Sequence, residues 1–168
     1  MGYSAQSSID WFINDPKIVG TQYVIDRDGK TFELWADNGY AYQFGLVSVP
    51  RRIEFEESTI GIELANLGPL TKLANGTFAD QYGRAYKGEI HYAKYRGYEY
   101  WETYTEAQYA ALRKLIQELA KKHNIKINPV NHIDFDLNVF DRHTLITHTN
   151  VRRDKTDVSP AFKWHQLN

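Results

Sequence analysis

The sequence predicts an α/β (α+β) fold in which helices flank a central mixed β-sheet. Short runs rich in β-branched and aromatic residues lie between turn signals, and a long amphipathic run with helical spacing follows them. Strands and helices mixed along one chain are typical of this class. Because the 168 residues contain no repeat, low-complexity tract or linker, we interpret residues 1–168 as a single domain.

Residues 9–13 are expected to form a short N-terminal helix. Ser7 or Ser8 supplies the hydroxyl that caps it, because serine side chains accept from the free backbone N–H groups of a first turn. Asp15-Pro16 ends the run, since proline disfavours helical backbone in the residue before it. This segment therefore predicts a brief helix ahead of the first strand.

Strands are expected in three places. Residues 21–25 and 30–35 are rich in β-forming residues and enclose the turn Asp26-Arg27-Asp28-Gly29, which indicates a hairpin. Residues 59–65 form an apolar run with one carboxylate inside it, which is typical of a buried strand. Residues 69–104 show only weak periodicity, and we interpret them as a long excursion with one hairpin.

The clearest predicted helix covers residues 106–123. Thr105 and Gln108 have the spacing of a capping box, apolar residues recur at helical intervals, and the basic end complements the helix dipole. A shorter helix is expected to start near Asp141 and run toward His148.

The composition excludes several classes of function. The net charge of −1 gives no sign of a nucleic-acid or anionic-membrane partner. No run of about 18 apolar residues marks a membrane span, and the N-terminus lacks the basic and apolar regions of a signal peptide. Cysteine is absent, which excludes disulfides and thiolate metal sites, so His and carboxylates are the strong metal ligands that remain.

Glu63 is a carboxylate inside an apolar strand, between Ile62 and Leu64. It faces either the core or a cleft, and burying it without a partner would be costly. Two interpretations stay open. Glu63 either points to water or to a lysine, or it is a general base whose pKa is raised by a partly apolar site.

A polar segment near the C-terminus holds the other candidates for chemistry. His148 and Asp157 are suitable zinc ligands, and Lys155 is suited to stabilising an oxyanion beside the metal. In extended backbone, Lys155 and Asp157 project to the same side because strand side chains alternate. Taken alone, the spacing also fits an ordinary polar loop in which these side chains are solvated.

Four segments, taken in order, resemble the motifs of one family. Residues 21–29 resemble His-Tyr-x-Ile-Asp-x-x-Gly, and residues 59–66 resemble the strand Ser-Ile-Gly-Ile-Glu-x-x-Asn. Residues 104–108 resemble the helix start Tyr-Thr-x-x-Gln, and residues 148–164 resemble His, then Lys-Thr-Asp, then Pro-x-Phe-x-Trp. The chain is thus similar to the zinc-dependent N-acetylmuramoyl-L-alanine amidases of type 2, which include T7 lysozyme and the peptidoglycan recognition proteins.

The resemblance implies a role for each matching residue. His148 and Asp157 would bind Zn²⁺, Glu63 would activate the water, and Lys155 would steady the oxyanion. The implied function is hydrolysis of the amide between N-acetylmuramic acid and L-alanine of peptidoglycan. The implied location is the cytoplasm, or release as a phage lysin. The sequence leaves the oligomeric state open.

The family's first zinc ligand, a His in an opening strand, has no counterpart in residues 1–168. Residues 2–8 resemble the turn that follows that strand. The strand is encoded ahead of Met1, or another chain supplies it, or the protein binds peptidoglycan without cutting it. Gln22 and Gln43 stand at two further positions where the family often has His. Those histidines are not metal ligands in the family pattern, so the change bears on substrate contacts and not on zinc. No spacing brings the remaining histidines to the site, namely His91, His123, His132, His143 and His165.

Aromatic residues make up 14% of the chain, and several gather in the excursion over residues 69–104. They either line a groove for a glycan or stem peptide, or cover the sheet and the 106–123 helix. The aromatic members of this group are Tyr92, Tyr95, Tyr98, Tyr100 and Trp101, and Arg96 lies among them.

Overall fold

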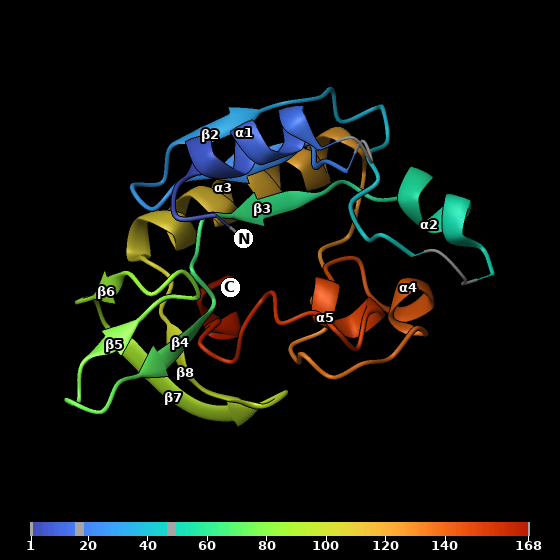
Figure 1. Ribbon diagram of the computed structural model, residues 1–168. Coiled ribbons are helices and arrows are strands. Elements are labelled where there is room, and N and C mark those ends of the chain that lie inside the picture. The colour runs from blue at the N-terminus through green and yellow to red at the C-terminus, as the bar shows by residue number, and fades with distance from the viewer. Residues whose placement is uncertain (1, 16–18, 47–49, 168) are drawn as a thin grey trace.

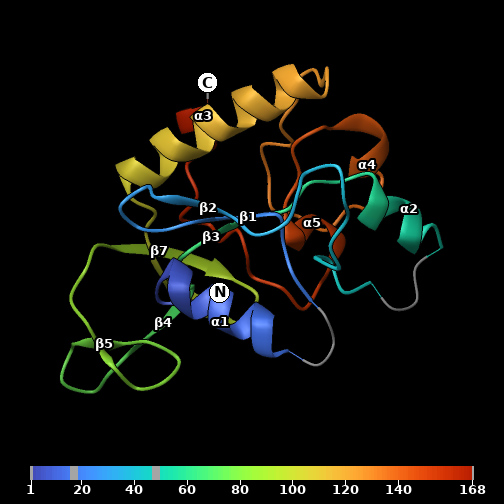
Figure 2. The same ribbon diagram turned by 90° about the horizontal axis from the view of Figure 1, so that it is seen from above.

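The first half of the chain contains a three-stranded mixed sheet with the strand order β2-β1-β3. The computed structural model describes residues 2–15, 19–46 and 50–167. β1 (Tyr23–Ile25) pairs antiparallel with β2 (Thr31–Glu33) and parallel with β3 (Ile62–Leu64). The predicted hairpin and buried strand are therefore confirmed. Helices α1 (Ala5–Asn14) and α3 (Glu106–Lys122) lie on opposite faces of this sheet (Figure 2).

The alternation of side chains along the strands fixes which face each residue occupies. On one face, Tyr23, Ile25 and Leu64 pack against α3, whose contributing residues are Tyr109, Leu112, Leu115 and Leu119. Glu63 and its register partner Val24 therefore lie on the other face, toward α1. The strand thus presents its only carboxylate away from the main core.

The two helix starts test the capping predictions. Thr105 and Gln108 form the predicted capping box, and α3 ends at His123. The cap of α1 is Ser4, with Ser7 completing a capping box, so the predicted caps Ser7 and Ser8 are wrong. The reciprocal Ser4–Ser7 bonds satisfy two backbone groups at once, which favours the earlier start. The helix ends at Asp15 as expected, and Pro16 lies outside the described residues.

The excursion over residues 69–104 is a five-stranded antiparallel sheet rather than a loop with one hairpin. Figure 1 shows it below the first sheet, in the order β6-β5-β4-β8-β7. Its strands are β4 (Pro69–Lys72), β5 (Phe78–Ala79), β6 (Ala85–Tyr86), β7 (Ile90–Tyr95) and β8 (Tyr98–Glu102). Periodicity failed here because two strands have only two residues each. Trp101 is fully buried whereas Tyr92 and Tyr98 are exposed, so the aromatic group is divided between core and surface.

The C-terminal third contains two separate helical turns instead of one helix from Asp141 toward His148. They are α4 (Val139–Arg142) and α5 (His148–Val151). Thr144 interrupts the helix because its hydroxyl donates to the carbonyl of Lys126 and accepts from the N–H of Asn128. A second core cluster joins these turns to α2 (Arg52–Glu57), through Phe44, Leu46, Phe55, Val130, Val139 and Val151.

The last segment returns to the start of α3. Phe162 packs edge-on against Tyr104 with ring centroids 5.3 Å apart, and the N–H of Lys163 donates to the Tyr109 hydroxyl. Trp164 begins the 3₁₀ turn η1 (Trp164–Leu167). The closing motif therefore serves the core and orients the polar segment that precedes it. Among the helices of the described ranges, none is both long and apolar enough to cross a membrane.

Within the described ranges, β3 is paired on one side only. The backbone groups of Gly61 and Ala65 bond to β1, so those of Ile62 and Leu64 point to the opposite side of the strand. That side borders a cavity with a volume of about 1590 Å³.

Candidate active site

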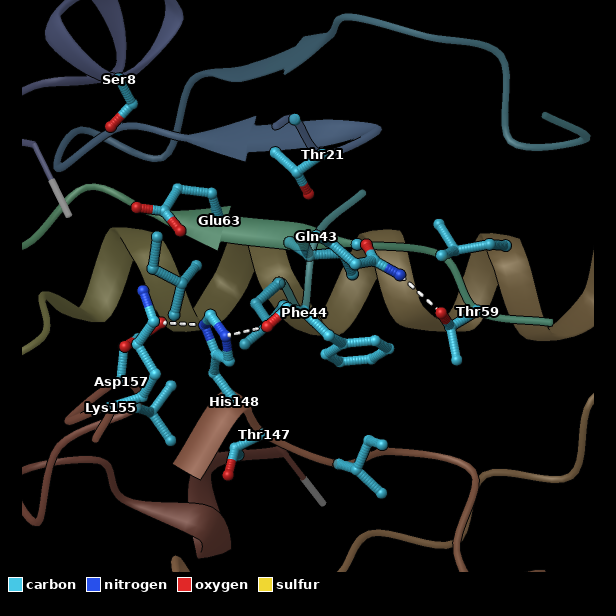
Figure 3. A pocket seen from close by; sticks show the side chains of 18 of the residues that line it. Ser8, Thr21, Gln43, Phe44, Thr59, Glu63, Thr147, His148, Lys155 and Asp157 are labelled. Atoms are coloured by element: carbon cyan, nitrogen blue, oxygen red, sulfur yellow. Dashed lines mark hydrogen bonds and ion pairs between the residues drawn. The ribbon is translucent and has the colours of Figure 1, made fainter. Parts of the chain in front are cut away.

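Glu63 forms one wall of this cavity. It stands on β3, near Ser8 of α1 (Figure 3). Withdrawal from bulk water raises the pKa of Glu63, and the nearby Asp157 raises it further, whereas His148 and Lys155 act in the opposite direction. A carboxylate with a raised pKa is suited to accept and release a proton.

His148 and Asp157 form a pair on the opposite wall (Figure 3). His148 is the first residue of α5, and its Nδ1 lies 2.9 Å from Oδ2 of Asp157. Its Nε2 lies 3.1 Å from the carbonyl oxygen of Phe44. Burial alone would raise the pKa of Asp157, but the hydrogen bond and charge of His148 outweigh it and hold that pKa well below its usual range. Asp157 is therefore ionised.

A short capping motif orients His148. Thr147 and Asn150 form a capping box around the single turn of α5. The amide of Asn150 also donates to the carbonyls of His132 and Asp134, at 3.2 and 2.8 Å. These bonds tie the turn to the neighbouring loop, so the imidazole projects from an anchored backbone.

All four residues predicted for the site line the same cavity, namely Glu63, His148, Lys155 and Asp157. They come from two parts of the chain that are far apart in sequence, a sheet strand and the segment after α5. The structure thus brings a carboxylate of raised pKa to the same cavity as a His–Asp pair and a lysine. That combination is suited to acid–base chemistry beside a bound metal.

His148 and Asp157 fit zinc by donor type, since imidazole nitrogen and carboxylate oxygen are both common zinc ligands. Two donors on a tetrahedral zinc lie roughly 3.3 Å apart, close to the 2.9 Å found between Nδ1 and Oδ2. Catalytic zinc normally takes three protein ligands. Within residues 2–15, 19–46 and 50–167, no group of three or more metal-ligating side chains exists. The described residues thus offer two candidate ligands, one fewer than the usual set.

The remaining histidines do not complete the set in the part of the chain that the structure describes. His123, at the end of α3, contacts Asp37 instead, with Nε2 2.9 Å from Oδ2. Lys122 donates to the other oxygen of Asp37 at 2.7 Å. This cluster anchors the end of α3, which agrees with a structural role for His123.

The two glutamines at frequent His positions have different surroundings. Gln22 is fully buried; its amide nitrogen donates to the carbonyl of Gly39, and its oxygen accepts from the N–H of Gly61. Gln22 therefore has a structural role, because it links the backbone at Gly39 to the backbone at Gly61. Gln43 lines the cavity and donates to the Thr59 hydroxyl at 2.5 Å. Its oxygen is buried beside the Cα of Gly61, and no hydrogen bond within the described residues uses it.

Glu56 supports the candidate site through the backbone that contacts His148, a role that the sequence did not reveal. Its fully buried carboxylate accepts the backbone N–H groups of Gln43 and Phe44. It thereby fixes the carbonyl of Phe44 that contacts His148. Burial raises the pKa of Glu56, and the backbone donors oppose that shift. Its signal in the sequence was weak because Glu56 lies in an ordinary charged helix beside Glu54 and Glu57.

Comparison with known proteins places the fold among amidases. A solved complex of the N-acetylmuramyl-L-alanine amidase AmiD from E. coli with the substrate anhydro-N-acetylmuramic acid-L-Ala-D-gamma-Glu-L-Lys has a similar structure, with a TM-score of 0.63 at 20% sequence identity. The similarity covers 96% of this chain and 51% of that chain, so this chain spans about half the length of AmiD. A comparison with curated proteins found no match.

The sequence itself matches a family model described as N-acetylmuramoyl-L-alanine amidase over residues 2–160. The chain therefore belongs to the N-acetylmuramoyl-L-alanine amidase family. The expected fold class and the family resemblance are both confirmed.

Proposed function

We propose that the protein hydrolyses the amide bond between N-acetylmuramic acid and L-alanine in peptidoglycan. The observation that carries this proposal is the convergence of Glu63 with His148, Lys155 and Asp157 on one cavity, in a chain of the amidase family. The similar AmiD structure contains a muramoyl-peptide substrate, which supports the same substrate class here.

Each side chain has a proposed part in the reaction. Glu63 accepts a proton from the attacking water and passes it to the leaving amine of L-alanine, for which a raised pKa is suitable. Lys155 stabilises the oxyanion of the tetrahedral intermediate by its positive charge. The amide C–N bond breaks, and the products are a muramoyl carboxylate and a free stem peptide.

Zinc is the proposed cofactor, held by His148 and Asp157 together with a third ligand from outside the described residues. When bound, zinc would polarise the carbonyl and lower the pKa of its water to about 7. We propose that the third ligand comes from a strand that pairs with the open edge of β3, because a strand added there would run beside both walls of the cavity.

A digest of purified disaccharide–peptide tests the reaction. Mass spectrometry is expected to find the stem peptide with a free L-alanine amine, together with the disaccharide. Glu63→Gln should abolish this release. Glu57→Gln is the matched control, because Glu57 also lines the cavity but lies in α2, away from the His–Asp pair. Full activity of the Glu63 variant would refute the assignment of the base.

A non-catalytic peptidoglycan-binding module is the second candidate. The observation that favours it is the two-ligand metal set within the described ranges. It predicts that the protein retains muropeptide without releasing a stem peptide, and that Glu63→Gln leaves this binding unchanged.

A further inference from the structure

The turn between β7 and β8 contains an unusual residue. Arg96 and Gly97 connect the paired residues Tyr95 and Tyr98, with φ angles of 47° and 85°. A two-residue turn with positive φ at both positions favours Asn, Asp or Gly, because a side chain at Cβ crowds the backbone there. An arginine at this position is a local conflict, and such conflicts often mark a functional requirement.

The guanidinium of Arg96 explains the conflict. It donates to three backbone carbonyls of one distant segment, with Nη2 2.9 Å from the oxygen of Thr149 and Nη1 2.7 Å from that of Arg152. Nη1 also donates to the carbonyl of Lys155. The side chain is half-buried and stacks over the ring of Tyr95, with 4.9 Å from Cζ to the centroid.

These three carbonyls lie within the segment that bears the proposed site. His148 directly precedes the first of them, Lys155 provides the last, and Asp157 follows two residues later. The segment's own backbone bonds include the single turn of α5, the bond from the N–H of Thr149 to the carbonyl of Asp157 at 3.0 Å, and one from the N–H of Lys155 to the carbonyl of Arg152 at 3.5 Å. Arg96 adds three hydrogen bonds that link both ends of this segment to the β7–β8 turn.

The chemistry of the contact requires an arginine. Carbonyl oxygens at three positions match the planar fork of a guanidinium, which has five N–H donors in fixed directions. An ammonium group is a point charge on a flexible stem and cannot span the three acceptors equally. In the part of the chain that the structure describes, no ion pair competes for this side chain.

We propose that Arg96 is a positioning residue that holds the His148–Asp157 segment in its active arrangement. This proposal rests on the proposed amidase function. Arg96 reaches no reacting atom. It acts by keeping the backbone of Lys155 at a fixed distance from α5, which sets where the lysine and Asp157 enter the cavity.

Three variants test the proposal. Arg96→Asn removes the guanidinium while giving the turn a residue that it favours, so the variant should fold. Arg96→Lys keeps the charge but not the fork. Lys94→Ala is the matched control, because Lys94 is a cation on the same hairpin whose contact is a solvent-exposed ion pair with Glu99.

The measurements are kcat and KM for stem-peptide release, the Tm, and hydrogen exchange at the amides of residues 149–157. Arg96→Asn should lower kcat by about 10- to 100-fold, the range for residues that orient metal ligands, with KM changed by less than about twofold. Its amides in this segment should exchange faster while those of α3 keep their protection. Arg96→Lys should be intermediate, and Lys94→Ala should equal the wild type.

An unchanged kcat in Arg96→Asn, or exchange that rises equally in α3, would overturn the proposal. If the wild type releases no peptide, the proposed function fails, but the exchange measurement still decides whether Arg96 holds the segment. Faster exchange confined to residues 149–157 would then support the structural half of the proposal without the catalytic half.

Discussion

The two walls of the cavity are built in different ways. The wall that carries Glu63 is a strand in a hydrogen-bonded sheet, packed on α3 by its apolar neighbours. The wall that carries His148, Lys155 and Asp157 is an irregular segment. Its geometry comes from contacts with distant side chains and carbonyls, such as those of Arg96 and Phe44.

This difference separates what a residue does from what holds it in place. Removing the Glu63 carboxyl should leave the sheet wall intact, because the ladder bonds of β3 use backbone atoms. On the segment wall, the single side chain of Arg96 holds three backbone carbonyls in place. We therefore expect substitutions there to change geometry and chemistry together, and the following predictions use this contrast.

The largest effect is expected for Asp157→Ala. It removes a proposed zinc ligand and the carboxylate that pairs with His148. Zinc affinity should fall by more than the roughly 10- to 100-fold typical of outer-sphere partners, and peptide release should reach background. Calorimetric titration with zinc measures the affinity. Asp154→Ala is the control, since Asp154 pairs with Arg152 in the same segment; equal losses in both variants would contradict the ligand assignment.

A smaller effect is expected for Lys155→Ala. Loss of the charge that stabilises the oxyanion should lower kcat by about 10²- to 10³-fold, while zinc stays bound. The backbone carbonyl that Arg96 contacts is retained in this variant. Steady-state kinetics beside Arg153→Ala check the prediction, because Arg153 instead lies over the ring of Phe135. A lost zinc site in Lys155→Ala would show that the residue acts on geometry.

Glu63→Gln should raise stability at neutral pH while it abolishes activity. The folded-state pKa of Glu63 is raised above its unfolded value of about 4.3, so ionisation costs stability as pH rises through this window. The substitution should therefore raise Tm at pH 7 more than at pH 4, by about 2–4 °C for each kcal/mol relieved. Thermal melts at both pH values measure it, and an equal shift at both would contradict a raised pKa.

The smallest effect is expected for Asp37→Asn, which lies on neither β3 nor the His148–Asp157 segment. Hydrogen bonds from Lys122, and then from His123, lower the pKa of Asp37. The contribution of these bonds to the free energy of unfolding is present above the unfolded pKa of about 3.9 and is lost as pH falls through the lower folded pKa. The variant should lose stability at neutral pH and converge with the wild type in acid. Urea unfolding at several pH values checks this, and parallel curves would count against it.

The sequence predicted the sheet wall better than the segment wall, because strands and caps are local signals. The hairpin around Asp26-Arg27-Asp28-Gly29 and the capping box of Thr105 follow from spacing alone. The shape of the segment after α5 depends on Arg96 and Glu56, which are far away in sequence and sit in unremarkable patterns. The sequence also predicted only one hairpin where the second sheet has five strands, and the two strands of two residues, β5 and β6, carry no period.

Assignment of His148, Lys155, Asp157 and Glu63 to one site came from the resemblance to the amidase family and not from spacing. The structure places all four on one cavity, while their catalytic roles stay predictions. The sequence could not indicate that the Gln43 oxygen is buried, because its position depends on the bare Cα of Gly61. A Cβ at Gly61 would lie 1.7 Å from the Gln43 oxygen.

The most direct test of the central claim is the amount of zinc bound per chain, measured together with stem-peptide release. The 168-residue chain is compared with a version extended upstream in the reading frame. We expect a version with a completed ligand set to bind one zinc and to release the peptide in proportion to its zinc content. A version that binds one zinc and retains peptidoglycan, yet releases no peptide, would contradict the proposed amidase activity. It would indicate that the protein is a peptidoglycan-binding module.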